Sequence, residues 1–170
     1  MSMKDTKQLI GDFNTLMVAN NYPVVSPVEQ NVMSDLMRKA PPEEWDAQKT
    51  SVYEDIQSLL INRKDYSDMF KIMDGLEFNG LTLYNLVQAE NGEPLWSNIY
   101  VRNFETRDNE IYVDPNLTDK VLIGEDGMSI FVYSLKGDCF QIRDKASTEY
   151  VIESHEKFSD FLTALFQTVN

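Results

Sequence analysis

The sequence predicts an α+β domain in which a central, mainly antiparallel sheet is flanked by N-terminal helices and a C-terminal helix. The first part of the chain repeats apolar residues at helical spacing, whereas residues 120–152 hold short runs of β-branched and aromatic residues. Glycine-containing bends separate these runs, and bends this short join antiparallel neighbours. An amphipathic segment then ends the chain. Helices, an antiparallel meander and a covering helix together are typical of the α+β class.

The first two helices are expected before Pro41. The first spans residues 4–20, and its apolar face holds Leu9, Phe13, Leu16 and Met17. For the second, Ser26 and Glu29 have the spacing of a capping box, with Pro27 at the first helical position. This second helix must stop before the proline pair that begins at Pro41.

Two further helices are expected before the sheet. One spans residues 43–61, with apolar positions at Trp45, Val52, Ile56, Leu59 and Leu60. A shorter one spans residues 65–73, and its apolar stripe holds Tyr66, Met69, Phe70 and Met73. Gly75 follows at a position suited to a left-handed C-cap.

The pattern then alternates between strand and helix. Residues 76–88 alternate around Asn79-Gly80, a two-residue hairpin signal. Residues 94–105 return to helical spacing, with Trp96, Ile99, Tyr100 and Asn103 on one face.

Four short strands and a helix complete the chain. The strands are expected at residues 121–125, 128–133, 139–143 and 149–152, and because both faces carry apolar groups we expect helices to cover most of both. The last helix should include Ser154 as its N-cap and His155 in its first turn. Its apolar face holds Phe158, Phe161, Leu162, Leu165 and Val169.

Length and charge limit the classes of function. A chain of 170 residues fits one domain, residues 1–170, with residues 1–50 as a helical extension packed on it. The net charge is −13, and residues 1–40 contribute nothing to it because their four acids balance four bases. An acidic field of this size opposes binding to nucleic acid and anionic lipid and attracts basic proteins. On charge alone, solubility is the simpler explanation.

The cysteine content and the hydropathy of the chain indicate its cellular compartment. There is one cysteine, no apolar run of signal-peptide length at the N-terminus and no run long enough to span a membrane. We therefore expect a cytoplasmic protein.

No arrangement of residues predicts an enzyme or a cofactor. The only histidine, His155, lies near no serine or cysteine motif, and Cys139 lies within an expected strand on its less apolar face, where it is open to solvent. Residues 114–125 follow an EF-hand count at several positions, but Asp119 replaces the required glycine. Nucleotide-binding glycine motifs are missing, so we expect no metal and no cofactor.

Several short motifs resemble the SUKH superfamily, in particular its YrhA-like branch of bacterial proteins. The likeness covers roughly residues 50–168, and where many relatives have a proline before the tyrosine of the fourth helix this chain has Asn62-Arg63-Lys64-Asp65. The matching residues are Tyr66, Phe70 and Gly75, then Phe78-Asn79-Gly80-Leu81, Leu83-Tyr84, Asn98-Ile99, Asn103, "VLIGED", "IFVYSLKGDCFQIRD" and "FSDFLTALF".

This resemblance implies a toxin-immunity protein that binds and neutralises a toxin, often a nuclease, without catalysing a reaction. Loops on a rigid frame are where binding residues concentrate. We therefore expect the acidic bends to contact the basic surface of a toxin, through Asp74, Glu77, Asn79, Glu125, Asp126, Asp138 and Asp144. Two alternatives are a regulatory or structural interaction module and a hydrolase that uses clustered carboxylates. The sequence does not fix the oligomeric state.

Overall fold

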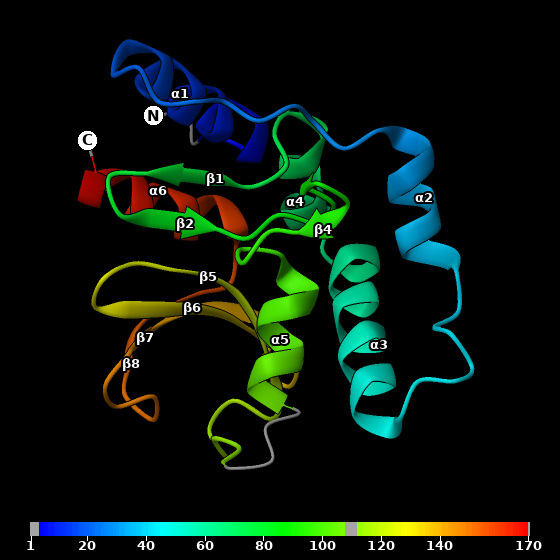
Figure 1. Ribbon diagram of the computed structural model, residues 1–170. Helices are drawn as coiled ribbons and strands as arrows, with labels where there is room; N and C mark the ends of the chain where they lie inside the picture. The colour runs from blue at the N-terminus through cyan, green and yellow to red at the C-terminus, as the bar shows by residue number, and fades with distance from the viewer. Residues whose placement is uncertain (1–3, 108–111, 170) are drawn as a thin grey trace.

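A computed structural model describes residues 4–107 and 112–169, and it has the α+β architecture that the sequence predicts (Figure 1). The helices are α1 (Thr6–Ala19), α2 (Gln30–Arg38), α3 (Ala47–Asn62), α4 (Lys64–Ser67), the 3-10 helix η1 (Asp68–Lys71), α5 (Ile99–Arg107) and α6 (Phe158–Val169). The strands are β1 (Leu76–Phe78), β2 (Leu81–Leu83), β3 (Ala89–Glu90), β4 (Glu93–Pro94), β5 (Lys120–Glu125), β6 (Ser129–Ser134), β7 (Cys139–Asp144) and β8 (Val151–His155).

One antiparallel sheet of six strands organises the molecule. Its strand order is β1-β2-β5-β6-β7-β8, so the last four strands form the meander expected from their short bends. Strands β3 and β4 form a separate two-stranded ribbon. No helix within the described ranges is long and apolar enough to cross a membrane.

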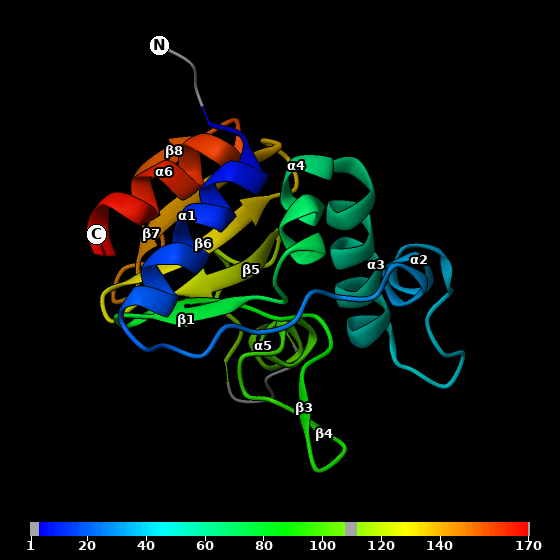
Figure 2. The ribbon, with the colours of Figure 1, turned by 90° about the horizontal axis from the view of Figure 1, so that it is seen from above.

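Helices α1 and α6 lie side by side over one face of the sheet (Figure 2). The ring of Phe161 on α6 packs against Phe131 and Phe140 of the sheet, with centroids 5.6 and 5.9 Å away. Phe13 of α1 meets Phe166 of α6 edge to face at 5.1 Å. This aromatic layer is the centre of the hydrophobic core.

The sequence predicts that helices cover most of both faces of the sheet. The opposite face is covered in another way. Helices α5 and α3 contact β5, and α5 does so at the edge of the strand, where Asn103 bonds the backbone of Leu122. Over β7, Arg143 donates hydrogen bonds to Gln141 and to the backbone oxygen of Thr148. Polar side chains and a loop therefore cover part of this face.

The hairpin predicted at Asn79-Gly80 is confirmed. Asn79 and Gly80 have φ values of 50° and 80°, and Phe78 pairs with Leu81 across the turn. Positive φ at both central residues is the geometry of a type I′ turn, which Asn-Gly favours. The left-handed conformation predicted for Gly75 is confirmed too, with φ 75°. A Cβ atom there would lie 2.6 Å from the carbonyl oxygen of Leu83, so only glycine fits.

The capping box predicted at residues 26–29 is wrong. Helix α2 begins at Gln30, and its N-cap Glu29 makes no side-chain capping bond. The backbone of the preceding segment pairs instead with distant residues: the amide of Val28 donates to the carbonyl of Phe70, and the amide of Asp74 donates to that of Ser26. These long-range bonds hold the segment extended past the predicted start. The capping box lies at α1, where the side chain of Asp5 accepts from the amide of Gln8 and the side chain of Gln8 accepts from the amide of Asp5.

The predicted start of the last helix is also wrong. Ser154 and His155 belong to strand β8, where they pair with Gln141 and Phe140 of β7. Helix α6 begins at Phe158, and its apolar face is buried as predicted. Two further side chains differ from expectation. Trp96 precedes α5 and is 55% exposed, and Cys139 is buried.

Candidate functional site

Three turns meet at one end of the sheet, which we call the hairpin end. They are the β1–β2 turn (residues 79–80), the β5–β6 turn (residues 126–128) and the β7–β8 turn (residues 145–150). The pairings of Thr82 with Glu125 and of Ser129 with Asp144 bring the turns together. Five of the seven predicted binding residues therefore lie at the hairpin end, namely Glu77, Asn79, Glu125, Asp126 and Asp144.

Asp74 is not available to a partner, so its place in the predicted surface is wrong. It is 2% exposed, and its carboxylate accepts hydrogen bonds from the backbone amides of Leu86 at 2.7 Å and Val87 at 3.1 Å. Burial raises the pKa of the Asp74 carboxyl, although the amide bonds oppose that shift. Asp74 fixes the loop that follows β2.

Asp138 lies at the opposite end of the sheet, in the β6–β7 turn. Its carboxylate accepts from the hydroxyl of Tyr133 at 2.7 Å and from the guanidinium of Arg63 at 3.0 Å. The hydrogen bond from Tyr133, followed by that from Arg63, lowers the pKa of Asp138. The structure therefore separates this carboxylate from the acids of the hairpin end.

Glu125 lies at the hairpin end but is largely engaged by its neighbours. It accepts from the hydroxyl of Tyr84 at 2.7 Å and from the ammonium of Lys145 at 2.8 Å, and Arg102 lies 3.6 Å away. Its side chain is only 18% exposed. Burial opposes ionisation, but these hydrogen bonds and charges outweigh it and lower the pKa of Glu125. Its charge is mostly compensated within the molecule.

Asp126 and Asp144 each stabilise their own turn. Asp126 accepts from the amides of Met128 and Ser129 at 2.9 and 2.7 Å. Asp144 accepts from the amide of Ala146 at 2.8 Å in the same way. These are Asx turns, which set the path of the backbone and leave the carboxylates near the surface.

Glu77 and Asn79 complete the hairpin end, and both are exposed. The side chain of Asn79 accepts from the hydroxyl of Tyr22 at 2.9 Å and donates to the carbonyl of Val169 at 3.4 Å. Asn79 thereby joins the turn to the segment after α1 and to the end of α6.

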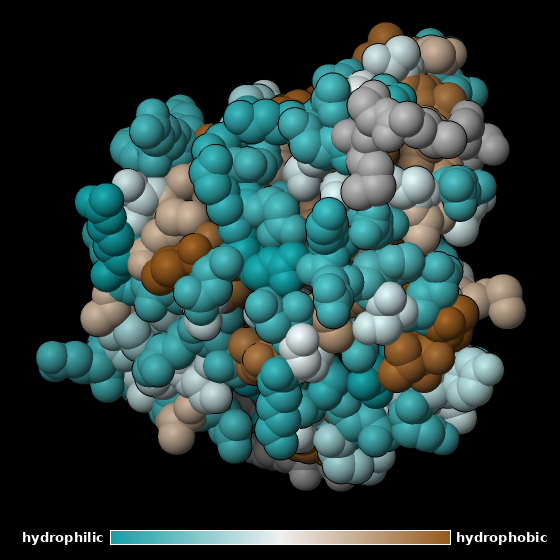
Figure 3. Space-filling view, turned by 180° about the vertical axis from the view of Figure 1, so that it is seen from behind, coloured by the Kyte–Doolittle hydropathy of each residue, from teal (hydrophilic) through white to brown (hydrophobic). Residues whose placement is uncertain are grey.

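A set of exposed apolar residues at this end was not identified from the sequence. Met128 is 82% exposed. Tyr150, Val151 and Ile152 are 63%, 39% and 47% exposed. The sequence does hold a signal for this exposed set, because Tyr150, Val151 and Ile152 directly follow Glu149 at the β7–β8 bend. Figure 3 shows apolar side chains gathered where β8 lies, among hydrophilic neighbours.

Strand β8 is the outermost strand of the sheet, so its outer edge pairs with no other described strand. Glu149 and Glu153 are exposed beside its apolar residues. We call this region the β8 surface and define it by Asp126, Met128, Asp144, Glu149, Tyr150, Val151, Ile152 and Glu153. Exposed apolar anchors inside an acidic border on a free strand edge are suited to binding a basic protein.

The residues weighed for catalysis lie on the neighbouring strands β7 and β8. His155 is on β8, 3.2 Å from the carboxylate of Glu153. The thiol of Cys139 lies 3.5 Å from the hydroxyl of Ser154 and 3.7 Å from the amide of Gln141. Within residues 4–107 and 112–169, no three His, Cys, Asp or Glu side chains are grouped so as to hold a metal ion.

Comparisons with known proteins give a sequence relative but no activity. The chain is 29% identical over 137 residues to an uncharacterised protein, YrhA of Escherichia coli (strain K12), which corresponds to 78% of this chain and 94% of that protein. No family model matches the chain, and no solved structure matches it.

Proposed function

We propose that this protein is an immunity protein of the SUKH type, which binds a toxin with a basic surface at the β8 surface and blocks it by stoichiometric association. The observation that carries the proposal is the free edge of β8, where Val151 and Ile152 are exposed between Glu149 and Glu153. The net charge of −13 and the motif resemblance to the SUKH superfamily support the same partner class.

The proposed mode of binding is addition of a toxin strand to the free edge of β8. Main-chain hydrogen bonds supply affinity in this mode, and side chains alternating along the strand supply specificity. Lysine or arginine residues of the toxin would meet Glu149 and Glu153, while its apolar residues cover Val151 and Ile152. Acids on the rest of the molecule steer the encounter at long range.

The first test identifies the partner. A pulldown from the native strain, read by mass spectrometry, should recover a toxin, and one equivalent of the protein should abolish that toxin's activity. A non-toxic partner would instead support a regulatory or structural interaction module. Turnover by the purified protein that is lost with a single carboxylate substitution would support a hydrolase.

The second test locates the surface. Ile152→Asp should weaken toxin binding by about tenfold or more, since it places a charge at an apolar anchor. Ile61→Asp is the matched control, because Ile61 is 55% exposed on α3, away from the sheet edge. Loss of binding in the control alone would place the interface on the helices.

The third test concerns charge. The double variant Glu149→Lys/Glu153→Lys should slow association more strongly at low salt than at high salt. Glu43→Lys/Glu44→Lys changes the net charge equally at exposed positions before α3. Equal slowing by both pairs would mean that only the total charge matters and would remove these two acids from the binding surface.

A further inference from the structure

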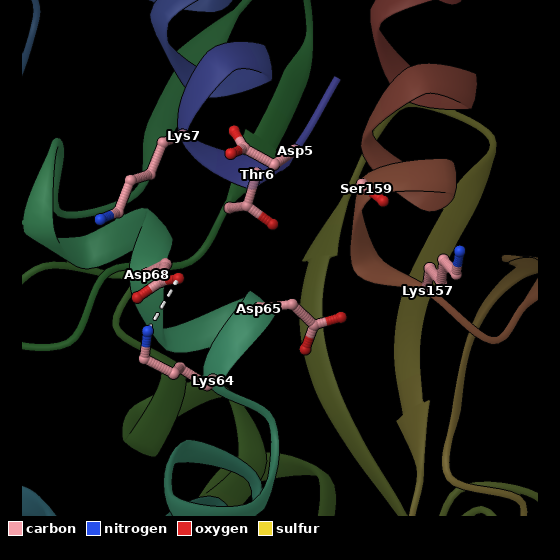
Figure 4. Close-up of a pocket in the computed structure, with 8 residues that line it drawn as sticks. All are labelled: Asp5, Thr6, Lys7, Lys64, Asp65, Asp68, Lys157 and Ser159. Carbon is pink, nitrogen blue, oxygen red and sulfur yellow. Dashed lines mark ion pairs between the residues drawn. The ribbon is translucent and has the colours of Figure 1, made fainter. Parts of the chain in front are cut away.

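A hollow of about 380 Å³ lies where α1 and α6 begin, at the end of the sheet opposite the hairpin end (Figure 4). Asp5, Thr6, Lys7, Lys64, Asp65, Asp68, Lys157 and Ser159 line it. Its residues come from both ends of the chain and from the α4 region, so folding alone brings them together. None of these lining residues belongs to the β8 surface.

The N-termini of two long helices meet at this hollow. Helix α1 has 14 residues and α6 has 12. The N-terminus of a helix carries unpaired amides and the positive end of its dipole, so it favours an anion. Asp65 already accepts from the amide of Phe158 at 3.0 Å, and Asp5 accepts from the amide of Gln8 at 2.9 Å. The structure therefore uses carboxylates to cap both helices.

A second observation, independent of the helix ends, is the hydroxyl of Thr6. Thr6 is 4% exposed, and its Oγ1 atom has no hydrogen-bond partner among the described residues. In Figure 4 this oxygen points into the space between Asp65 and Ser159. A buried hydroxyl left unpaired is unfavourable, so a hydrogen-bond acceptor bound in the hollow would stabilise it.

Two of the three carboxylates that line the hollow are already compensated. Arg63 donates two hydrogen bonds to Asp65, at 3.0 and 2.7 Å, and Lys71 lies 3.0 Å from Asp68. The third, Asp5, caps α1 but forms no ion pair among the described residues, so one carboxylate at the hollow keeps its charge.

Two lysines at the hollow have no such compensation. No carboxylate within residues 4–107 and 112–169 forms an ion pair with the ammonium of Lys7 or Lys157. The two free ammonium groups outnumber the one unpaired carboxylate of Asp5, on a chain whose net charge is −13.

We propose that this hollow binds a small tetrahedral oxyanion of the phosphate type, either free or as the terminal group of a phosphorylated metabolite. Lys7 and Lys157 supply charge, and the hydroxyls of Thr6 and Ser159 donate hydrogen bonds. A ligand held between α1 and α6 binds the folded state alone, so it stabilises the fold.

The test measures binding of inorganic phosphate to the full-length protein by calorimetry and by thermal unfolding, against chloride at equal ionic strength. Phosphate should bind with saturation and raise the melting temperature. A phosphate monoester that competes for the same site would identify the phosphate group as the recognised element. Absence of any saturable response up to roughly 50 mM phosphate would overturn the proposal.

Two variants assign the binding to the hollow. Lys157→Gln should weaken phosphate affinity about tenfold, as expected for a lost charge-assisted hydrogen bond. Lys39→Gln makes the same change at an exposed lysine that pairs with Asp35 at the end of α2. Equal weakening in both variants would mean a non-specific charge effect and would refute the site.

The second variant is Thr6→Val, which removes the hydroxyl and keeps the shape. Because that hydroxyl is unpaired in the free protein, the valine variant should be at least as stable as the original without phosphate. It should nevertheless bind phosphate several-fold more weakly. Unchanged phosphate affinity in this stable variant would remove Thr6 from the site and the proposal with it.

Discussion

Arg63 joins three segments that are distant in the sequence. Its guanidinium donates to the carbonyl of Asp138 at 3.0 Å and to that of Glu156 at 2.7 Å, and it holds Asp65 through two further bonds. It also lies 4.7 Å from the ring centre of Phe140. The planar fork of arginine allows all these contacts at once, which a lysine would not reproduce. This one side chain fixes the start of α4, the β6–β7 turn and the start of α6.

The Asp65 carboxylate in this group predicts a pH dependence of stability. Burial opposes its ionisation, but the hydrogen bonds from Arg63 and from the amide of Phe158 outweigh burial and lower the pKa of Asp65. A lowered folded-state pKa means that the stabilisation is complete well above the ordinary value of 3.8 and is lost as the pH falls through and below it.

Asp65→Asn should therefore lower the free energy of unfolding at neutral pH, and the difference from the original protein should shrink as the pH falls below about 4. Urea unfolding at a series of pH values measures it. Comparing the two proteins at each pH cancels the contributions of the other acids. A difference that stays constant across this range would contradict the assigned role of Asp65.

At the scale of elements, α5 completes the edge of strand β5. Strand β2 ends at Leu83 and pairs with β5 only near residues 124–125. Beyond it, the side chain of Asn103 donates to the carbonyl of Leu122 and accepts from its amide, both at 2.9 Å. Arg107 then donates to the carbonyl of Lys120 at 2.7 Å.

The spacing of these contacts has a simple geometric reason. Four residues of helix rise about 6 Å, and two residues of strand rise about 6.6 Å. Residues four apart on α5, Asn103 and Arg107, can therefore reach backbone groups two apart on β5, Leu122 and Lys120. The helix side chains take the place of a neighbouring strand.

Asn103→Leu should destabilise the protein by about 2–4 kcal/mol, because it leaves the buried amide and carbonyl of Leu122 without partners. Urea unfolding measures the loss. Asn31→Leu is the matched control, an identical change at an exposed position of α2, and should change stability by less than about 0.5 kcal/mol. Similar values for the two variants would show that Asn103 does not secure β5.

Elements with local signals could be predicted, and those fixed from a distance could not. The Asn79-Gly80 hairpin needs positive φ at both positions, a requirement written into two adjacent residues. The start of α6 has no such local signal, because its first amide is capped by Asp65, a residue 93 positions earlier. Ser154 has a residue type that favours a helix N-cap, but it belongs to strand β8, where it pairs with Gln141 of β7.

At the scale of the whole molecule, the N-terminal helices share one hydrophobic core with the sheet. Leu9, Ile10, Phe13 and Met17 of α1 are buried, and Phe13 contacts Phe166 of α6. The segment after α1 adds Tyr22, which packs edge to face on Phe78 at 4.7 Å. The expectation that residues 1–50 pack on a single domain therefore has a direct test.

A chain that lacks residues 1–21 should lose cooperative folding or at least several kcal/mol of stability. The physical reason is that the deletion exposes the apolar surface of α6 that α1 covers. Thermal unfolding followed by circular dichroism measures the change. Since Phe166→Ala removes one partner of the same contact and leaves α1 in place, it should cost less than the deletion. An equally stable truncated chain would mean that the extension is not part of the domain.

The candidate sites divide in the same way between local and long-range causes. The sequence located acidic bends, and antiparallel pairing brought five of the seven predicted residues to the hairpin end. It could not reveal that Asp74 is buried, because its partners at Leu86 and Val87 lie beyond an intervening hairpin. Nor could it reveal the hollow between α1 and α6, whose lining residues Lys7 and Lys157 are separated by 150 positions.

The sequence by itself determined the α+β class, the order of helices and meander, the type I′ turn and the acidity of the chain, because periodicity, turn chemistry and charge are properties of neighbouring residues. Tertiary structure alone decided which acids stay free, which apolar residues remain exposed along β8 and which lysines converge on one hollow. These depend on contacts between residues far apart in the chain, where burial and hydrogen bonding with distant partners decide whether a side chain is left open to bind anything else.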